Sequence, residues 1–169
     1  MSGAEAPVPR SEAWLRRYAR QVVLPGFGED GQERLGRAFA RVVGGGGAAE
    51  ACALHLRAAG VGRVEAGDMS GKGDTSNAAA DVVVVVGPSA GAPPAAAGAR
   101  VVVVEKDGDG VTVGEREAAR PEAAVPTEGP LALAAGALAA DLALRVLLGR
   151  PKSEKAIRLA PGGSVGMRR

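Results

Sequence analysis

The chain has 169 residues, of which 46% are apolar and only 2% aromatic, and its formal net charge at pH 7 is +2. This length is typical of a single domain. The composition predicts a core of Ala, Val and Leu rather than of aromatic side chains. The one cysteine, Cys52, excludes an internal disulfide and a four-thiolate zinc site, and it fits a reducing compartment. Residues 1–10 lack the basic start and apolar run of a secretory signal. We therefore expect a cytoplasmic protein without zinc.

Positive charge is concentrated at the end of the chain, where residues 145–169 hold seven Lys or Arg and only Glu154 as an acid. The predicted organisation is a disordered N-terminus at 1–10, a single α/β domain at 11–150 and a basic C-terminal tail at 151–169. No aromatic residue interleaves the charges of the tail, so nucleic acid is not an expected partner. The apolar stretch at 131–148 is interrupted by Asp141 and Arg145, which favours a soluble helix over a membrane span.

Two short helices are predicted at the start of the domain. Ser11 offers an N-cap for a helix that runs to about Gln21, on which Trp14 and Tyr18 share one apolar face. After a Pro-Gly turn, residues 29–38 predict a second short helix.

A strand, a tight turn and a helix are predicted next. Phe39–Val43 is a short apolar run, four glycines follow at 44–47, and residues 48–59 form an Ala-rich helix that Gly60 ends.

The rest of the domain predicts further strands and one long helix. Arg63–Gly67, Val82–Val86 and 101–104 read as strands, with a small strand at 111–113 and a helix at 129–148. Unbroken runs of valine are typical of central strands that are buried on both faces of a parallel sheet. The segments between these strands are too short and too rich in Gly and Pro for long crossover helices. The predicted fold is α/β and Rossmann-like, with a mostly parallel sheet of four to five strands that lacks some crossover helices.

The glycine turn matches the pattern G-x-G-x-x-G/A at Gly44, Gly46 and Ala49. Its place after a strand and before a helix would allow the backbone to approach a phosphate at the helix N-terminus. Asp68 ends the next predicted strand, where an acidic group can accept hydrogen bonds from ribose hydroxyls. The alternative is a tight turn that holds no ligand.

Other polar residues give weaker signals. Cys52 and His55 are spaced i,i+3 on one predicted helix, but no second pair accompanies them, so a structural role is favoured over a metal site. Lys72 and Asp74 could meet phosphate or metal, although charges in loops are usually solvated.

The sequence at 17–28, RYARQVVLPGFG, continues as DGQERL at 30–35. This run resembles the N-terminal signature of the bacterial ThiF/MoeB/HesA adenylyltransferases. The strand and glycine loop that follow, the segment AAGVGRV at 58–64 and the final helix at 129–149 resemble that family as well.

The resemblance implies a fold that activates the C-terminal glycine of a ubiquitin-like or sulfur-carrier protein by adenylation with MgATP. By resemblance, Gly44, Gly46 and Gly47 would line the phosphate loop and Asp68 would bind the ribose. Arg20 would reach across a dimer interface to the phosphates bound by the neighbouring subunit.

The chain departs from the family in the residues of the active site. Only twelve residues separate Asp68 from Asp81, where the family has a segment with an arginine and a lysine for the ATP phosphates. After the valine strand, Gly87 and Pro88 stand where the family has an aspartate for magnesium. The zinc cysteines and the acceptor thiol are absent from the sequence too.

These departures favour a catalytically degenerate companion or scaffold subunit with residual ATP binding. It would form a homodimer, or a heterodimer with a ThiF-like paralogue, and would act with a small ubiquitin-like or sulfur-carrier protein. Two alternatives stay open: an active ATP-dependent adenylyltransferase of a carrier protein C-terminus, and an NAD-binding Rossmann protein, which the glycine loop and Asp68 would also suit.

Overall fold

The computed structural model describes residues 10–67, 80–87, 99–116, 125, 128–152, 155–161 and 165–168. The contacts of the chain divide it into two units, residues 1–33 and 34–169, and each unit is described by itself.

The first unit holds helix α1 (Glu12–Val22) and the start of α2 (Gly28–Arg37), as the sequence predicted. The Ser11 hydroxyl caps α1 by accepting a hydrogen bond of 3.2 Å from the Trp14 backbone N–H. The Trp14 ring meets Tyr18 edge-on at 5.4 Å, and the Arg10 guanidinium lies 5.1 Å from the centre of the Trp14 ring. None of the residues of α1 is buried.

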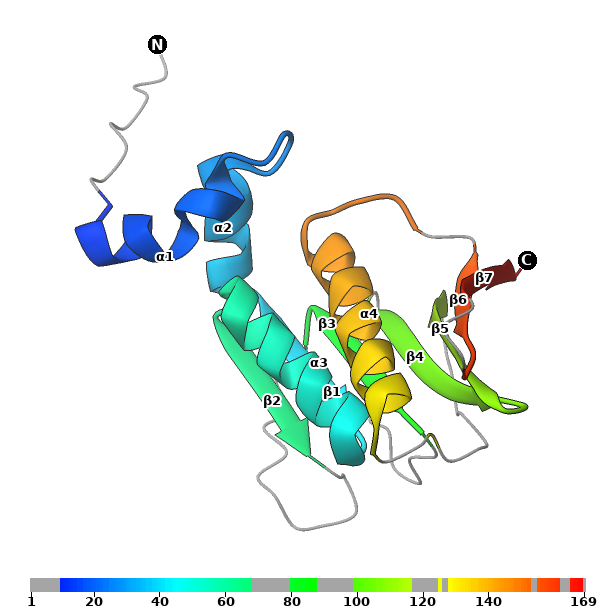
Figure 1. The fold of residues 1–169 in the computed structure, drawn as a ribbon. Helices are drawn as coiled ribbons and strands as arrows, with labels where there is room; N and C mark the ends of the chain where they lie inside the picture. The colour runs from blue at the N-terminus through cyan, green and yellow to red at the C-terminus, as the bar shows by residue number, and fades with distance from the viewer. Residues whose placement is uncertain are drawn as a thin grey trace. The chain divides into compact units, whose positions relative to one another are not determined.

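The second unit is built on a seven-stranded sheet in the order β2-β1-β3-β4-β5-β6-β7 (Figure 1). The strands are β1 (Phe39–Val43), β2 (Arg63–Gly67), β3 (Val82–Val86), β4 (Arg100–Asp107), β5 (Gly110–Arg116), β6 (Ala156–Leu159) and β7 (Val165–Arg168). β1 pairs in parallel with β2 and β3, β3 pairs in parallel with β4, and the remaining pairs are antiparallel. The prediction that the two valine runs form central strands of a parallel sheet is confirmed, and the two strands lie next to each other.

The sheet is larger than the predicted four to five strands, because β6 and β7 form in the segment expected to be a basic tail. β6 pairs with β5, where Val111 lies opposite Leu159. Arg158 of β6 forms ion pairs with Asp107 (3.1 Å) and Asp109 (2.7 Å) of the β4–β5 hairpin. Part of the positive charge that suggested a solvated tail is therefore neutralised inside the sheet structure.

Helices α3 (Gly46–Ala59) and α4 (Pro130–Leu147) cover one face of the sheet and run in the same direction (Figure 1). They approach each other closely at Gly136 of α4. A Cβ atom there would lie 2.3 Å from the Ala48 carbonyl oxygen and 2.8 Å from the Ala51 Cβ. Small side chains thus let the two helices pack together and share a core with the sheet.

Helix α4 also has the length and apolar composition of a membrane span, as core helices of soluble proteins often do. Of its 18 residues, 44% are buried inside the protein.

The opposite face of the sheet has its own buried apolar cluster, formed by Phe39, Val43, Ala80, Val83, Val85, Val101 and Val103. In the part of the second unit that the structure describes, the helices that pack on the sheet are α3 and α4, and both lie on the other face. The segments in which crossover helices were predicted to be missing, 68–79 and 88–98, lie outside the described residues.

Candidate functional site

The glycine turn begins where β1 ends. Gly44 has a φ of 118°, and its N–H donates a hydrogen bond of 3.2 Å to the Gly67 carbonyl at the end of β2. A Cβ atom on Gly44 would lie only 2.1 Å from the carbonyl oxygen of Val86 in β3. The packing of the turn against β3 therefore requires a glycine at this position, whether or not a ligand binds.

The turn leads into an open helix N-terminus. Gly45 is the N-cap of α3, no side chain caps the helix, and its first turn contains no acidic residue. A Cβ atom on Gly45 would have no neighbour within 4 Å. Gly46, with a φ of 77°, and Gly47 follow as the first two residues of the helix. Uncapped N–H groups and the helix dipole favour an anion such as phosphate at this end.

The other residues predicted for this site are not among those that the structure describes. Asp68, Lys72 and Asp74 lie outside the described residues. The strand that precedes Asp68 ends at Gly67, which lies beside Val43 in the parallel register of β1 and β2.

Arg20 lies in the first unit, on an exposed position of α1. A simple structural role for Arg20 would be an ion pair with Glu33. Among the described residues, Glu33 accepts a hydrogen bond of 3.2 Å from Arg10 instead. The role that the resemblance gives to Arg20 stays a prediction.

Cys52 and His55 do not form a pair of metal ligands. Cys52 is fully buried, and burial raises the pKa of its thiol to about 12, whereas His55 is exposed to solvent. Within the described ranges, no group of three or more His, Cys, Asp or Glu side chains is placed to hold a metal ion. The thiol is an apolar part of the core.

We expect the Cys52 thiol to resist modification in the folded protein. An unfolded thiol ionises near pH 9, but the buried one ionises near 12, so the native state holds more protons between these values. The free energy of unfolding should therefore fall as the pH rises from about 9 to 12, and Cys52→Ala should flatten this decline. Urea titrations at several pH values and reaction with a chromogenic disulfide would measure both effects. Rapid labelling of the native protein at pH 8 would contradict the burial.

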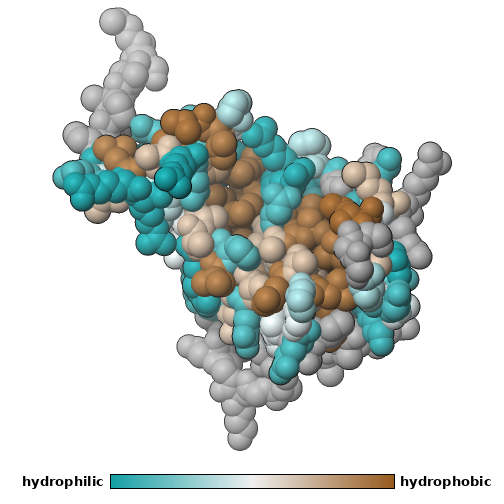
Figure 2. Space-filling model, in the orientation of Figure 1, coloured by the Kyte–Doolittle hydropathy of each residue, from teal (hydrophilic) through white to brown (hydrophobic). Residues whose placement is uncertain are grey.

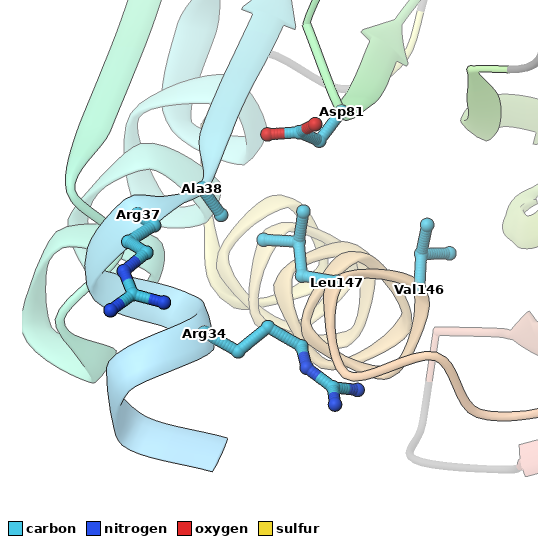
Figure 3. Close-up of a pocket in the computed structure, with 6 residues that line it drawn as sticks. All are labelled: Arg34, Arg37, Ala38, Asp81, Val146 and Leu147. Carbon is cyan, nitrogen blue, oxygen red and sulfur yellow. The ribbon is translucent and has the colours of Figure 1, made fainter. Parts of the chain in front are cut away.

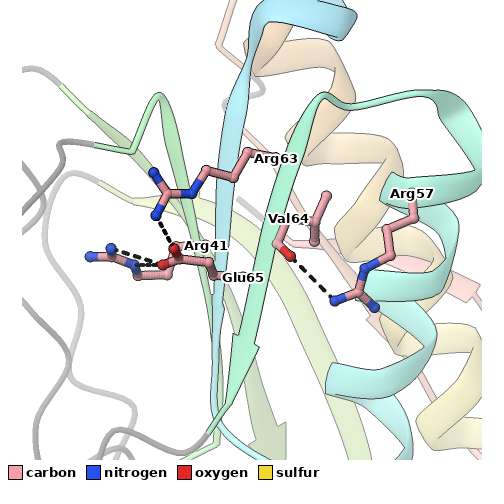
Figure 4. A network of polar contacts seen from close by, with 5 residues as sticks. All are labelled: Arg41, Arg57, Arg63, Val64 and Glu65. Atoms are coloured by element: carbon pink, nitrogen blue, oxygen red, sulfur yellow. Dashed lines mark hydrogen bonds and ion pairs between the residues drawn. The ribbon is translucent and has the colours of Figure 1, made fainter. Parts of the chain in front are cut away.

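A charged network that sequence reasoning missed lies on the sheet face opposite α3 (Figure 4). Arg41 donates to Glu65 Oε2 from Nε (3.3 Å) and Nη2 (3.0 Å), and Arg63 donates to Glu65 Oε1. Burial acts to raise the pKa of Glu65, but hydrogen bonds from Arg41 and Arg63 lower it overall. Both guanidiniums also lie over the Phe39 ring, at 5.2 and 4.4 Å from its centre. The network joins β1 to β2, and its signal in the sequence is one charged residue in β1 and two in β2 at alternate positions.

A pocket of about 380 Å³ lies at the opposite edge of the sheet, where the parallel strands begin (Figure 3). It is lined by Arg34, Arg37, Ala38, Asp81, Val146 and Leu147. Arg34 Nη1 donates to the Leu148 carbonyl (3.0 Å), and Asp81 Oδ2 accepts from the Phe39 N–H (2.8 Å). Arg34 thus contacts the C-terminal end of α4, and Asp81 contacts the first residue of β1. The glycine turn follows the last residue of β1, so the pocket is not part of it.

The parallel strands, the glycine turn and the helix that follows define a Rossmann-like fold of the nucleotide-binding type. Solved structures share this fold. PaaA matches with a TM-score of 0.64 and 12% identity, over 100% of this chain and 77% of PaaA. A structure of E. coli MccB with MccA matches with a TM-score of 0.63 and 14% identity, over 95% of this chain and 72% of MccB.

The curated relatives match over a shorter segment at higher identity. Protein HesA, vegetative, of Trichormus variabilis is 52% identical over 50 residues, which are 30% of this chain and 19% of HesA. The sulfur carrier protein adenylyltransferase of Thermus thermophilus is 56% identical over 50 residues, or 30% of this chain and 18% of that protein. The chain thus matches about a fifth of the length of these relatives, and no family model matches it. The segment matches confirm the resemblance to the ThiF/MoeB/HesA family that the N-terminal signature indicated, and the solved structures share the fold.

Proposed function

We propose that this protein is a catalytically degenerate, cytoplasmic ThiF-type subunit that assists in the activation of a ubiquitin-like or sulfur-carrier protein. In this role it pairs with another ThiF-type chain or with itself, and it retains weak binding of an adenine nucleotide such as ATP. The observation that supports nucleotide binding is the uncapped N-terminus of α3, where Gly45 faces open space. Among the solved structures of the same fold, one contains E. coli MccB with ATP.

The loss of catalysis is inferred from the short connections around the glycine turn. β2 and β3 lie on either side of β1, and the segment that joins them is too short for the phosphate-binding cations that the family resemblance implies. After β3, the chain turns at Gly87, whose φ is 70° and whose N–H donates to Val104, where the family has its magnesium aspartate. Adenylation depends on positioned cations and a metal to stabilise developing charge. Losing several of them together should lower the rate by orders of magnitude.

A companion role is supported by helix α1. None of its residues is buried within the chain, and Val23 and Leu24 just after it are 75% and 54% exposed. A helix that buries so little is suited to dock on another subunit. One relative is a sulfur carrier protein adenylyltransferase, and a subunit of this class is the partner that we propose.

We expect ATP to bind weakly to the protein, and Gly45→Val to weaken that binding by at least about tenfold. The Cβ atom of the valine would meet no neighbour within 4 Å, so the free energy of unfolding should change by less than about 1 kcal/mol, while the added bulk at the N-cap should hinder a phosphate. Gly166→Ala, a substitution in β7 that also meets no neighbour within 4 Å, is the matched control and should leave binding intact. Calorimetry with ATP and urea unfolding of the three proteins would measure the two quantities.

The same preparation tests the loss of catalysis. ATP-pyrophosphate exchange should stay at background when a carrier protein with a C-terminal Gly-Gly is added. Exchange at the rate of a full-length family member would overturn the degenerate assignment. If calorimetry detects no heat of ATP binding at millimolar concentration, the proposed nucleotide site is wrong. Only the scaffold role would then remain.

A further inference from the structure

The pocket at the beginning of the parallel strands lies away from the glycine turn and has no part in the proposed function. All of its lining residues belong to the second unit of the chain. Its volume of about 380 Å³ lies in the range of about 300 to 1,000 Å³ that is typical of small-molecule sites. The pocket can therefore hold a small ligand, and the side chains that line it indicate which kind.

Three lining residues are apolar, and we call them the apolar floor: Ala38, Val146 and Leu147. They are 7%, 9% and 8% exposed, so they form the edge of the core. Val146 and Leu147 are the last two residues of α4, and Ala38 comes directly before β1. A ligand that rests on this floor gains from an apolar body, such as a chain of methylene groups. Figure 2 shows that hydrophobic surface also gathers elsewhere on the molecule, so the floor alone does not select a ligand.

The charged side chains of the pocket lie on two sides of the apolar floor. Figure 3 shows Asp81 on one side of Leu147, and the guanidiniums of Arg34 and Arg37 on the other side. All three charged residues are exposed to solvent. Charges of opposite sign thus flank an apolar surface. A complementary ligand carries a cation at one end and an anion at the other.

Backbone contacts hold two of these charged side chains in place. Asp81 Oδ2 accepts a hydrogen bond of 2.8 Å from the Phe39 N–H, and Arg34 Nη1 donates one of 3.0 Å to the Leu148 carbonyl. A carboxylate can accept about four hydrogen bonds and a guanidinium offers several N–H donors, so both groups can bind a ligand as well. Because the contacts already order these side chains, a ligand loses less affinity to ordering them.

We propose that this pocket binds a small ω-amino acid, in which a methylene chain separates an ammonium group from a carboxylate. The ammonium group donates to Asp81, the methylene chain packs on the apolar floor, and the carboxylate accepts from Arg34 and Arg37. An α-amino acid is less complementary, because its two charged groups share one carbon atom and no methylene chain between them covers the floor. The site is separate from the glycine turn, so its ligand binds independently of ATP.

A series of ligands that differ by one group tests this assignment on the full chain. Calorimetry with 4-aminobutyrate, 5-aminopentanoate and 6-aminohexanoate identifies the chain length that fits best. The unsubstituted acid and the amine of that length should each bind at least about tenfold more weakly, because each lacks one charge-assisted contact. Leucine should bind more weakly by a similar factor. Equal affinity of the acid and the ω-amino acid would overturn the proposal, and so would the absence of binding heat at about 10 mM ligand.

Asp81→Asn and Asp141→Asn form a matched pair of variants. Asparagine keeps an oxygen that can accept from the Phe39 N–H, so Asp81→Asn should fold, as circular dichroism and urea unfolding would establish. It should weaken the ω-amino acid at least about tenfold without weakening the unsubstituted acid. Asp141 is 53% exposed on α4 and does not line the pocket, so Asp141→Asn should leave both affinities unchanged. Equal binding by Asp81→Asn and the wild type would refute the contact with the ammonium group.

The double variant Arg34→Gln with Arg37→Gln tests the other side of the pocket. It should weaken the ω-amino acid and the unsubstituted acid but not the amine, and equal weakening of the amine would contradict the proposal. If a variant fails to fold, the ligand series on the wild type still decides the outcome. ATP calorimetry on the same proteins separates this site from the nucleotide site, because each ligand should bind whether or not the other is present.

Discussion

Gly44→Ala is expected to remove most of the stability of the folded protein. The added Cβ would lie 2.1 Å from the Val86 carbonyl oxygen, a backbone atom in the centre of the sheet, so β1 and β3 would have to separate. The φ of 118° at Gly44 adds strain, because side chains rarely adopt this backbone conformation. Together these effects should lower the free energy of unfolding by about 3 kcal/mol or more, out of the 5 to 15 kcal/mol that is typical of a domain.

Gly45→Ala provides the matched control one residue later in the same turn. Gly45 has a φ of −128° and open space around its Cβ position, so alanine should cost less than about 1 kcal/mol there. Urea titrations followed by circular dichroism would compare the two variants with the wild type. Equal stability of Gly44→Ala and the wild type would show that the turn does not pack on β3 as described.

Arg20→Ala should depress adenylation in a mixed complex with a full-length ThiF-type adenylyltransferase from the same organism. If Arg20 reaches the ATP phosphates of that partner, removing it should cost several powers of ten in rate, as the loss of an arginine finger does. Arg20→Lys should restore only part of the rate, because lysine lacks the bidentate fork of arginine. Pyrophosphate exchange by the mixed complex, with the carrier protein present, is the measurement.

Arg16→Ala is the control for this experiment, since Arg16 is exposed on the same helix and forms an i,i+4 pair with Glu12. Arg16→Ala should leave the rate within about twofold of the wild type. Gel filtration would establish that each variant still forms the mixed complex. Normal activity of a complex that contains Arg20→Ala would reject donation in trans and leave the scaffold role alone.

The sequence by itself determined the parallel core of the fold. β1, β2 and β3 have the bounds that were predicted, because each is a short segment between turn residues and two of them, β1 and β3, are mostly apolar. The end of α3 was also predicted correctly, because Gly60 is a C-cap glycine in the left-handed conformation, with a φ of 91°. Such features depend on neighbours in the chain and are therefore visible in a local pattern. The N-terminal signature also indicated the family, which the curated matches support.

Features that depend on residues far apart in the sequence were decided only by the tertiary structure. β6 and β7 looked like a basic tail, because their ladder with β5 and the ion pairs of Arg158 exist only once the sheet has formed. The bond between Arg41 and Glu65 requires the parallel register of β1 and β2.

The glycine turn shows the same limit. Its sequence suggested phosphate contacts for Gly44, yet the need for glycine at this position comes from Val86, 42 residues away. Gly45, which meets no neighbour, is left open toward a ligand. A local pattern predicts that a turn forms, whereas the contacts that make each residue necessary arise from the packing of separate strands.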